Sequence, residues 1–282
     1  PRMGPRLQYG GSAGAAADAP ARCALCPPFH RESGLNVERT SRARRVLRAS
    51  RLALHFLRGT VIVTFVYPFL ADNSRLRLKQ RWSRQVLDIL GIRLAADLSA
   101  IEPGSLIVAN HISWVDVFVL NAARPVAFVS KSEVRRWPLV GWLAMRTDTV
   151  FLRRGSRGHA QIVNAEIDAL LNTGKDVALF PEGTTTDGTH MLGFHAALLQ
   201  PAVETGRPIQ PVALSYQGNN GLRSVAPAYA GETTLMGSLH AILSTQGITA
   251  RAVALPALTP VGRHRRELAH MARERIATSI GV

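Results

Sequence analysis

The sequence predicts an α/β protein with a mostly parallel sheet covered by helices, preceded by a membrane-associated helical hairpin. Three observations support this prediction. From about residue 92 onward, short apolar runs of strand length alternate with segments of helical period. The 282 residues contain 46% hydrophobic and 19% charged side chains, which is typical of a globular chain with a substantial core. Upstream of the alternation lies a segment that is both basic and strongly apolar.

The first 36 residues are rich in Gly, Ala, Pro and Arg and have neither helical nor strand periodicity. This composition predicts a disordered leader over residues 1–36. The leader holds both cysteines of the chain, Cys23 and Cys26. Because no second pair of ligands and no surrounding βαβ pattern accompany them, they indicate neither a zinc site nor a redox pair. No metal site is expected elsewhere in the sequence.

Residues 37–91 are predicted to form two membrane-associated helices. The apolar run 52–71 has about the length of a bilayer span, but His55 and Arg58 interrupt it. Basic residues flank it on both sides, so charge does not orient a span. A helix lying in the membrane surface against anionic lipids therefore fits better, and a helix packed on the protein's own core is the alternative. Residues 74–90 continue as a second amphipathic helix.

The alternating region is expected to form one α/β domain over residues 92–262, which carries the chemistry of the protein, followed by a basic helix within 263–282. Strands are expected at 106–109, 126–130, 149–152, 177–180, 209–216 and 253–258. Helices are expected at 114–123, 137–145, 159–172, 194–204 and 265–276.

Candidate catalytic residues follow the first of these strands. His111 comes at the carboxyl end of the run, where open α/β sheets build their sites. Ser113 fits the N-cap of the next helix, and Asp116 lies about one turn into it, from where its carboxylate reaches back to the imidazole. Such a carboxylate fixes the histidine tautomer and stabilises the imidazolium that forms on proton uptake. Alternatively, Ser113 and Asp116 form a capping box without catalytic function.

A second polar stretch, Phe180-Pro-Glu-Gly-Thr184, also follows an apolar run. Together with Asn110-His-Ile-Ser-Trp-Val-Asp116 it resembles the two main motifs of the glycerolipid acyltransferases of the lysophosphatidic acid acyltransferase type. The resemblance covers roughly residues 50–260. Further family blocks are matched by Lys131-Ser-Glu133 with Pro138 and Gly141, by Val150-Phe-Leu-Arg-Arg154, and by Pro211-Val-Ala-Leu214.

The resemblance implies that an acyl group moves from acyl-CoA or acyl-carrier protein to the free hydroxyl of a lysophospholipid, with no further cofactor. The first expected acceptor is 1-acyl-glycerol-3-phosphate, which gives phosphatidic acid. His111 is then the general base and Asp116 its orienting partner. Arg154 and Arg153 are expected at the acceptor phosphate, because an arginine fork suits a phosphate. The full set of expected substrate contacts is Arg154, Arg153, Glu182, Gly183, Thr184, Asn110, Ser113 and Lys131.

Two details of the site remain as expectations. The continuation Thr185-Thr-Asp-Gly188 departs from the commoner Arg and Ser of the family and is similar to that of lyso-ornithine-lipid acyltransferases. A lyso-ornithine lipid or another lysolipid is therefore the alternative acceptor. The oxyanion of the acyl-transfer intermediate is expected to bind a backbone N–H near the His111 turn.

The formal charge of +15 favours an anionic partner. Nucleic acid is not expected, because aromatic residues make up only 6% of the chain and no nucleic-acid-binding module is visible. The lysophospholipid acceptor, the acidic acyl donor and an anionic membrane surface are the expected partners. We expect the protein at the cytoplasmic face of the membrane, held peripherally or through one inserted N-terminal segment.

Overall fold

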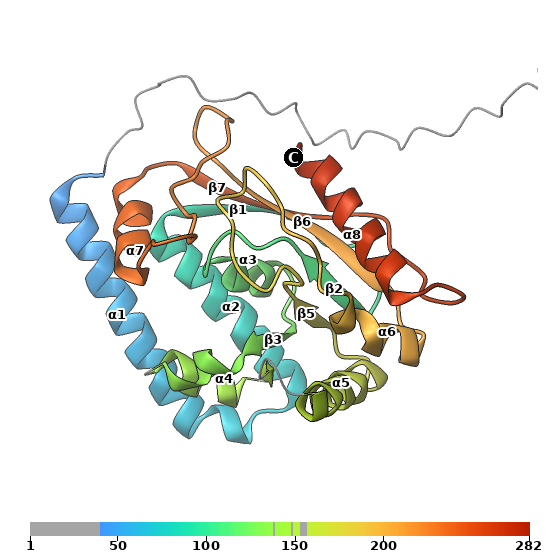
Figure 1. Ribbon diagram of the computed structural model, residues 1–282. Coiled ribbons are helices and arrows are strands. Elements are labelled where there is room, and N and C mark those ends of the chain that lie inside the picture. The colour runs from blue at the N-terminus through green and yellow to red at the C-terminus, as the bar shows by residue number, and fades with distance from the viewer. Residues whose placement is uncertain (1–39, 138, 148, 153–156) are drawn as a thin grey trace, which may run out of the picture.

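The computed structural model describes residues 40–282 except 138, 148 and 153–156. A seven-stranded sheet forms its centre, in the spatial order β1-β7-β6-β2-β5-β3-β4 (Figure 1). The strands are β1 (Ile92–Asp97), β2 (Leu106–Ala109), β3 (Ala127–Lys131), β4 (Thr149–Leu152), β5 (Val177–Leu179), β6 (Ile209–Gln217) and β7 (Ile248–Ala254).

Eight α-helices and three short 3₁₀ segments are assigned in the described residues. The α-helices are α1 (Arg42–Phe65), α2 (Asp72–Leu90), α3 (Asp116–Ala123), α4 (Val140–Arg146), α5 (Arg157–Asn172), α6 (Gln200–Thr205), α7 (Leu235–Ser244) and α8 (Arg265–Ile280). The 3₁₀ segments are η1 (Tyr67–Phe69), η2 (Ser132–Arg136) and η3 (Ala196–Leu199).

All strand pairs are parallel except β6 with β7, which is antiparallel. The prediction of a mostly parallel sheet covered by helices is therefore confirmed. Strand β2 lies between β5 and β6, and each of its four side chains is buried. A strand covered on both faces needs apolar residues at every position, which is why it appears in the sequence as an uninterrupted apolar run.

Two apolar cores cover the two faces of the sheet. One face packs against α2 and α3 through side chains such as Val86, Leu90 and Val119. The other packs against α5, α6 and α8 through side chains such as Ile167, Ala202 and Leu268. The result is a three-layered arrangement in which α3, which begins at Asp116, is held between the sheet and α2.

An aromatic cluster joins α1 to the layer formed by α2 and α3. Trp82 of α2 stacks on His55 with ring centroids 5.0 Å apart, and it lies 5.2 Å from Phe56 and 5.7 Å from Phe118 of α3. Gly59 permits this close approach, because a Cβ atom there would lie 2.9 Å from the Trp82 indole nitrogen. Burial lowers the pKa of His55. One face of α1 thus packs on the protein's own core, as the alternative interpretation of its apolar run supposed.

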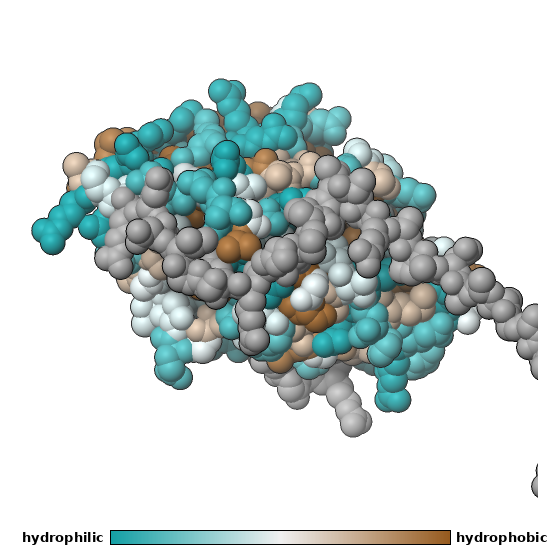
Figure 2. Space-filling view, turned by 90° about the horizontal axis from the view of Figure 1, so that it is seen from above, coloured by the Kyte–Doolittle hydropathy of each residue, from teal (hydrophilic) through white to brown (hydrophobic). Residues whose placement is uncertain are grey.

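The opposite face of α1 is exposed and apolar. We define the exposed apolar stripe as Leu54, Leu57, Val61, Phe65 and, in η1, Phe69, whose exposed fractions are between 50% and 86%. In Figure 1 α1 runs down the left side and ends beside α4, which it contacts. Figure 2 views the molecule from the top of Figure 1, where the coloured atoms are mostly hydrophilic and hydrophobic residues are scattered.

None of the helices within the described residues combines the length and the apolar character that crossing a bilayer requires. The membrane association of residues 37–91 stays a prediction, as does the division of the chain at residues 91 and 262. The predicted leader, residues 1–36, lies outside the described residues.

Several predicted elements need correction. Strand β1 and helix α7 were not predicted, and the last strand lies at Ile248–Ala254, not at 253–258, although Leu258 forms a single bridge with Ile209. The segment expected as a helix at 194–204 is η3 followed by α6. The first helix begins at Arg42, so the arginine-rich stretch belongs to the helix itself.

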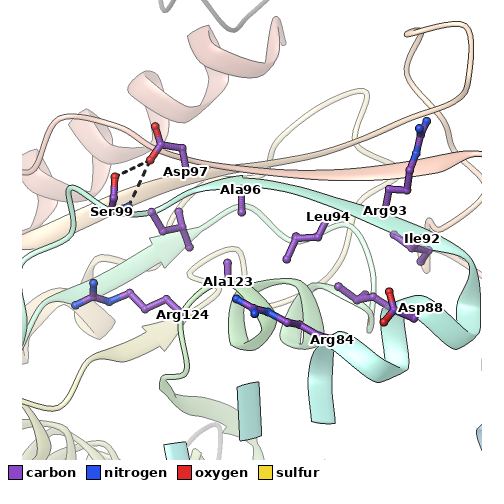
Figure 3. Close-up of a pocket in the computed structure, with 12 residues that line it drawn as sticks. Arg84, Asp88, Ile92, Arg93, Leu94, Ala96, Asp97, Ser99, Ala123 and Arg124 are labelled. Atoms are coloured by element: carbon purple, nitrogen blue, oxygen red, sulfur yellow. Dashed lines mark hydrogen bonds between the residues drawn. The ribbon is translucent and has the colours of Figure 1, made fainter. Parts of the chain in front are cut away.

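A cavity of about 840 Å³ lies beside edge strand β1, with Leu94 and Ala96 facing Arg84 and Arg124 (Figure 3). Both cations are used structurally, since Arg124 pairs with Asp176 at 2.6 Å and Arg84 donates to the Ala122 carbonyl at 2.8 Å. Arg124 follows the end of α3, whereas Asp116 begins it, so roughly 12 Å of helix separates this cavity from His111. It is not the site that the sequence motifs indicate.

Candidate active site

The two polar motifs meet at one edge of the sheet. Strand β2 is parallel to both of its neighbours, β5 and β6, so the residues that follow β2 and β5 leave the sheet at the same edge. The Thr186 N–H donates to the His111 carbonyl at 2.9 Å, which joins the two motif loops directly. The structure therefore brings together two sequence stretches that lie about seventy residues apart.

His111 and Asp116 form a hydrogen-bonded pair. The imidazole Nδ1 lies 2.8 Å from Asp116 Oδ2, which also accepts the N–H groups of Ile112 and Ser113 at 2.7 and 2.9 Å. Asp116 is fully buried, whereas the His111 side chain is 20% exposed. Because a buried carboxylate must accept hydrogen bonds from all its neighbours, Nδ1 carries a proton, and Nε2 is the ring nitrogen that is left unprotonated in the neutral imidazole.

The carboxylate of Asp116 also organises the start of α3. The helix begins at Asp116, two residues later than predicted, and Val115 occupies the N-cap position. Ser113 is not that cap, but its Oγ accepts the Val115 N–H at 3.2 Å and its N–H binds Asp116. The same carboxylate therefore binds the backbone at the start of the helix and the ring of His111.

Glu182 holds two loops together. Its Oε1 accepts the His111 N–H at 2.8 Å and its Oε2 accepts the Leu192 N–H at 2.9 Å. Only 3% of the residue is exposed. Burial raises the pKa of Glu182, and the two backbone N–H groups and His111 oppose that shift. Both oxygens are thus directed at the backbone.

The other residues of the second motif shape the turn. Phe180 stacks on His111 with ring centroids 3.9 Å apart and an interplanar angle of 7°, so it fixes the plane of the imidazole. Gly183 has φ 69°, the left-handed region that favours glycine, and its N–H donates to the Phe180 carbonyl. Thr184, which follows, is exposed.

Asn110 anchors the other end of the His111 turn. Its side-chain amide donates to the Leu214 carbonyl at 2.9 Å and accepts the Leu214 N–H at 2.8 Å, so it pairs with β6 as a further strand residue would. Only 1% of Asn110 is exposed. One donor and the acceptor oxygen of the Asn110 amide are therefore bound to the backbone of β6.

Replacing Asn110 by alanine is expected to reduce the free energy of unfolding by ~3 kcal/mol, because two buried backbone groups of Leu214 lose their partners. Denaturant titration of the purified variant measures this change. Asn73→Ala, on the exposed first turn of α2, is the matched control and is expected within about 0.5 kcal/mol of the parent. Equal stability of the two variants would contradict the structural assignment.

The expectation of an oxyanion donor near the His111 turn stays a prediction, but three backbone amides of that turn are already paired. The N–H of His111 donates to Glu182, and those of Ile112 and Ser113 donate to Asp116. Backbone donors that are already paired with carboxylates are not available to a developing negative charge. The turn instead uses its amides to hold the histidine.

The remaining candidates are only partly described. Lys131 ends β3 and is half-buried. Arg153 and Arg154 lie outside the described residues, so their predicted contact with an acceptor phosphate is untested. The roles of all these residues as substrate contacts stay predictions.

One neighbour of the pair was not predicted at all. The hydroxyl of Tyr216, near the end of β6, donates to Asp116 Oδ1 at 2.6 Å. It lies one hundred residues from Asp116 in the sequence, so no local spacing indicates the contact. The available signal was weak: a tyrosine in an otherwise buried strand needs a partner for its hydroxyl.

Comparison with known proteins gives the chemistry of this arrangement a context. The family model described as Acyltransferase matches residues 92–215. A lyso-ornithine lipid O-acyltransferase of Pseudomonas aeruginosa is 35% identical over 206 residues, which are 73% of this chain and 79% of that protein. A 1-acyl-sn-glycerol-3-phosphate acyltransferase of Neisseria meningitidis is 37% identical over 64% of this chain and 71% of that protein.

The fold has a solved counterpart. The crystal structure of the acyltransferase PlsC from Thermotoga maritima matches with a TM-score of 0.61 and 21% identity, over 84% of this chain and 96% of that one. This likeness concerns the fold alone. Together with the family model and the similarity to the Pseudomonas enzyme over most of its length, it leads to one conclusion. The chain belongs to the acyltransferase family.

Proposed function

We propose that the protein transfers a fatty acyl group to the free hydroxyl of a lysolipid, with His111 as general base and Asp116 as its orienting partner. The observation that carries this proposal is the His111–Asp116 pair at 2.8 Å, whose histidine side chain is 20% exposed, in a chain of the acyltransferase family. The names of the relatives include lysolipid acceptors, which supports the same reaction class.

The proposed reaction needs one proton carrier. Nε2 of His111 takes the proton of the acceptor hydroxyl as that oxygen attacks the thioester carbonyl. The new C–O bond forms, the C–S bond of the tetrahedral intermediate breaks, and the departing thiolate takes the proton from the imidazolium. Asp116 stabilises that imidazolium while remaining ionised. The donor is proposed to be acyl-CoA or acyl-carrier protein, since both carry the acyl group as a thioester.

Two acceptors are favoured by different observations. The predicted phosphate contacts of Arg153 and Arg154 suit 1-acyl-glycerol-3-phosphate. The name of the Neisseria relative gives the same acceptor. Lyso-ornithine lipid is the second candidate, because it is the acceptor in the name of the Pseudomonas relative, 79% of which this chain covers. Acyl transfer to each lysolipid, measured on purified protein with acyl-CoA and with acyl-carrier protein as donor, decides between them.

A hydrolase using the same histidine is the competing reaction, because water can replace the lysolipid hydroxyl. Measuring free fatty acid together with the diacyl product separates the two. Fatty acid release without diacyl lipid, for every acceptor offered, would refute the proposed function.

The exposed apolar stripe supports attachment to a membrane surface. Arg44, Arg51 and Arg58 recur every seven residues, and each precedes a member of the series Leu47, Leu54 and Val61 by three. On a helix this spacing places a row of cations beside the apolar row, the pattern of a helix that lies in an anionic bilayer surface. All six side chains of these two rows are exposed.

Replacing Val61 by aspartate is expected to weaken binding to vesicles of anionic phospholipid by about tenfold or more, because one inserted apolar side chain is lost and a negative charge is added. Sedimentation with vesicles measures the affinity. The matched control is Val261→Asp, at an exposed valine between β7 and α8, which is expected to bind as the parent does. Equal weakening by both changes would indicate a charge effect and not insertion of the stripe.

A further inference from the structure

Asp116 has an unusually complete set of hydrogen-bond donors. Three N–H groups converge on Oδ2: the ring Nδ1–H of His111 and the backbone N–H groups of Ile112 and Ser113. The fourth donor, the hydroxyl of Tyr216, is the one directed at Oδ1. It comes from β6, whereas the other three donors belong to the His111 turn. Because both oxygens are held, the carboxylate cannot rotate away from the imidazole.

We propose that Tyr216 is a positioning residue of the acyl-transfer site, which acts through Asp116 to set the basicity of His111. This inference rests on the proposed function. A donor on Oδ1 draws charge away from Oδ2, so the carboxylate stabilises the imidazolium less than it would alone. His111 therefore stays neutral, and able to accept a proton, down to a lower pH.

The tyrosine is well suited to this function because it remains a donor. It is 2% exposed, and burial, together with the charge of Asp116, raises the pKa of Tyr216 well above its ordinary value. Among the described elements, one further titratable group faces the pair: Glu182, from the loop after β5, whose charge acts on both His111 and Asp116. Both oxygens of Glu182 accept backbone N–H groups. The Tyr216 hydroxyl donates to Asp116 instead.

Tyr216→Phe removes the donor and keeps the ring. We expect the acidic limb of the kcat–pH profile to move to higher pH by roughly half a unit to one unit, with KM for the acceptor changed less than about twofold. The NMR titration midpoint of the His111 imidazole is expected to move in the same direction. Tyr67→Phe, which removes the hydroxyl of another buried tyrosine, is the matched control and is expected to leave both curves in place.

The NMR readout separates failure of this inference from failure of the proposed function, because it requires no acyl transfer. An unmoved His111 midpoint in Tyr216→Phe would overturn the inference, even if kcat falls, since packing alone would explain that fall. If the variant does not fold, fluorotyrosine can replace the four tyrosines of the parent chain. Its more acidic hydroxyl is a stronger donor, so the midpoint is then expected to move to lower pH, and no movement or the opposite one overturns the inference.

Discussion

His111→Ala is expected to reduce kcat for acyl transfer by about 10²–10⁴-fold, the usual contribution of a general base. The pair with Asp116 at 2.8 Å and the stacking of Phe180 fix the ring and leave Nε2 as the proposed proton acceptor, and alanine provides no group to accept the hydroxyl proton. A kinetic assay of diacyl lipid formation measures the loss. The fold is expected to persist, because the histidine backbone, not its ring, binds Glu182.

The control for this variant is His240→Ala, at an exposed histidine of α7, which is expected to keep the parental kcat. Asp116→Asn provides a second test. A neutral amide stabilises the imidazolium less than a carboxylate does, so this variant is expected to lose activity even if its oxygen keeps the three converging N–H groups. Parental activity in His111→Ala would remove the histidine from the mechanism.

Glu182→Gln is expected to reduce activity by about 10²-fold, although the side chain need not touch the substrate. The glutamine nitrogen must face either the His111 or the Leu192 N–H, and two donors repel each other. The loop that carries His111 then shifts, and misplacement by about 1 Å costs on that order in rate. The free energy of unfolding is expected to fall by about 1–3 kcal/mol, since a buried amide loses its acceptor.

Glu102→Gln makes the same chemical change at an exposed glutamate before β2 and is expected to alter neither quantity. The kinetic pattern distinguishes positioning from acceptor binding. A lower kcat with an unchanged KM fits the observed backbone contacts. A raised KM for the acceptor with unchanged kcat and stability would instead support the substrate contact that the sequence resemblance implies.

The sequence predicts the central strands and the His111–Asp116 pair well, because both leave local signals. Strand β2 is an uninterrupted apolar run, and the five-residue separation of His111 and Asp116 is short enough for direct contact. Strand β1 was missed because it is an edge strand with mostly exposed residues, so its sequence lacks an apolar run. Helix α7 buries only Ser238, Ile242 and Leu243, too few for a clear helical period.

The contacts of the site were harder to predict than its members. Glu182 was identified as a site residue, but its partners are backbone amides, which any sequence provides. Tyr216 and Leu214 reach the site only because β6 pairs with β2, and strand order is not written in the spacing of residues. Long-range pairing, rather than residue type, decided these cases.

The aromatic cluster around Trp82 has a consequence for how the enzyme meets its substrate. It links α1, which carries the exposed apolar stripe, to α3, which begins at Asp116, through rings 5.0 to 5.7 Å apart. If the stripe sets the depth of α1 in the bilayer, this packing sets the height of the histidine above it. A lysolipid would then be acylated only if its hydroxyl lies at that height above the bilayer, whatever its headgroup.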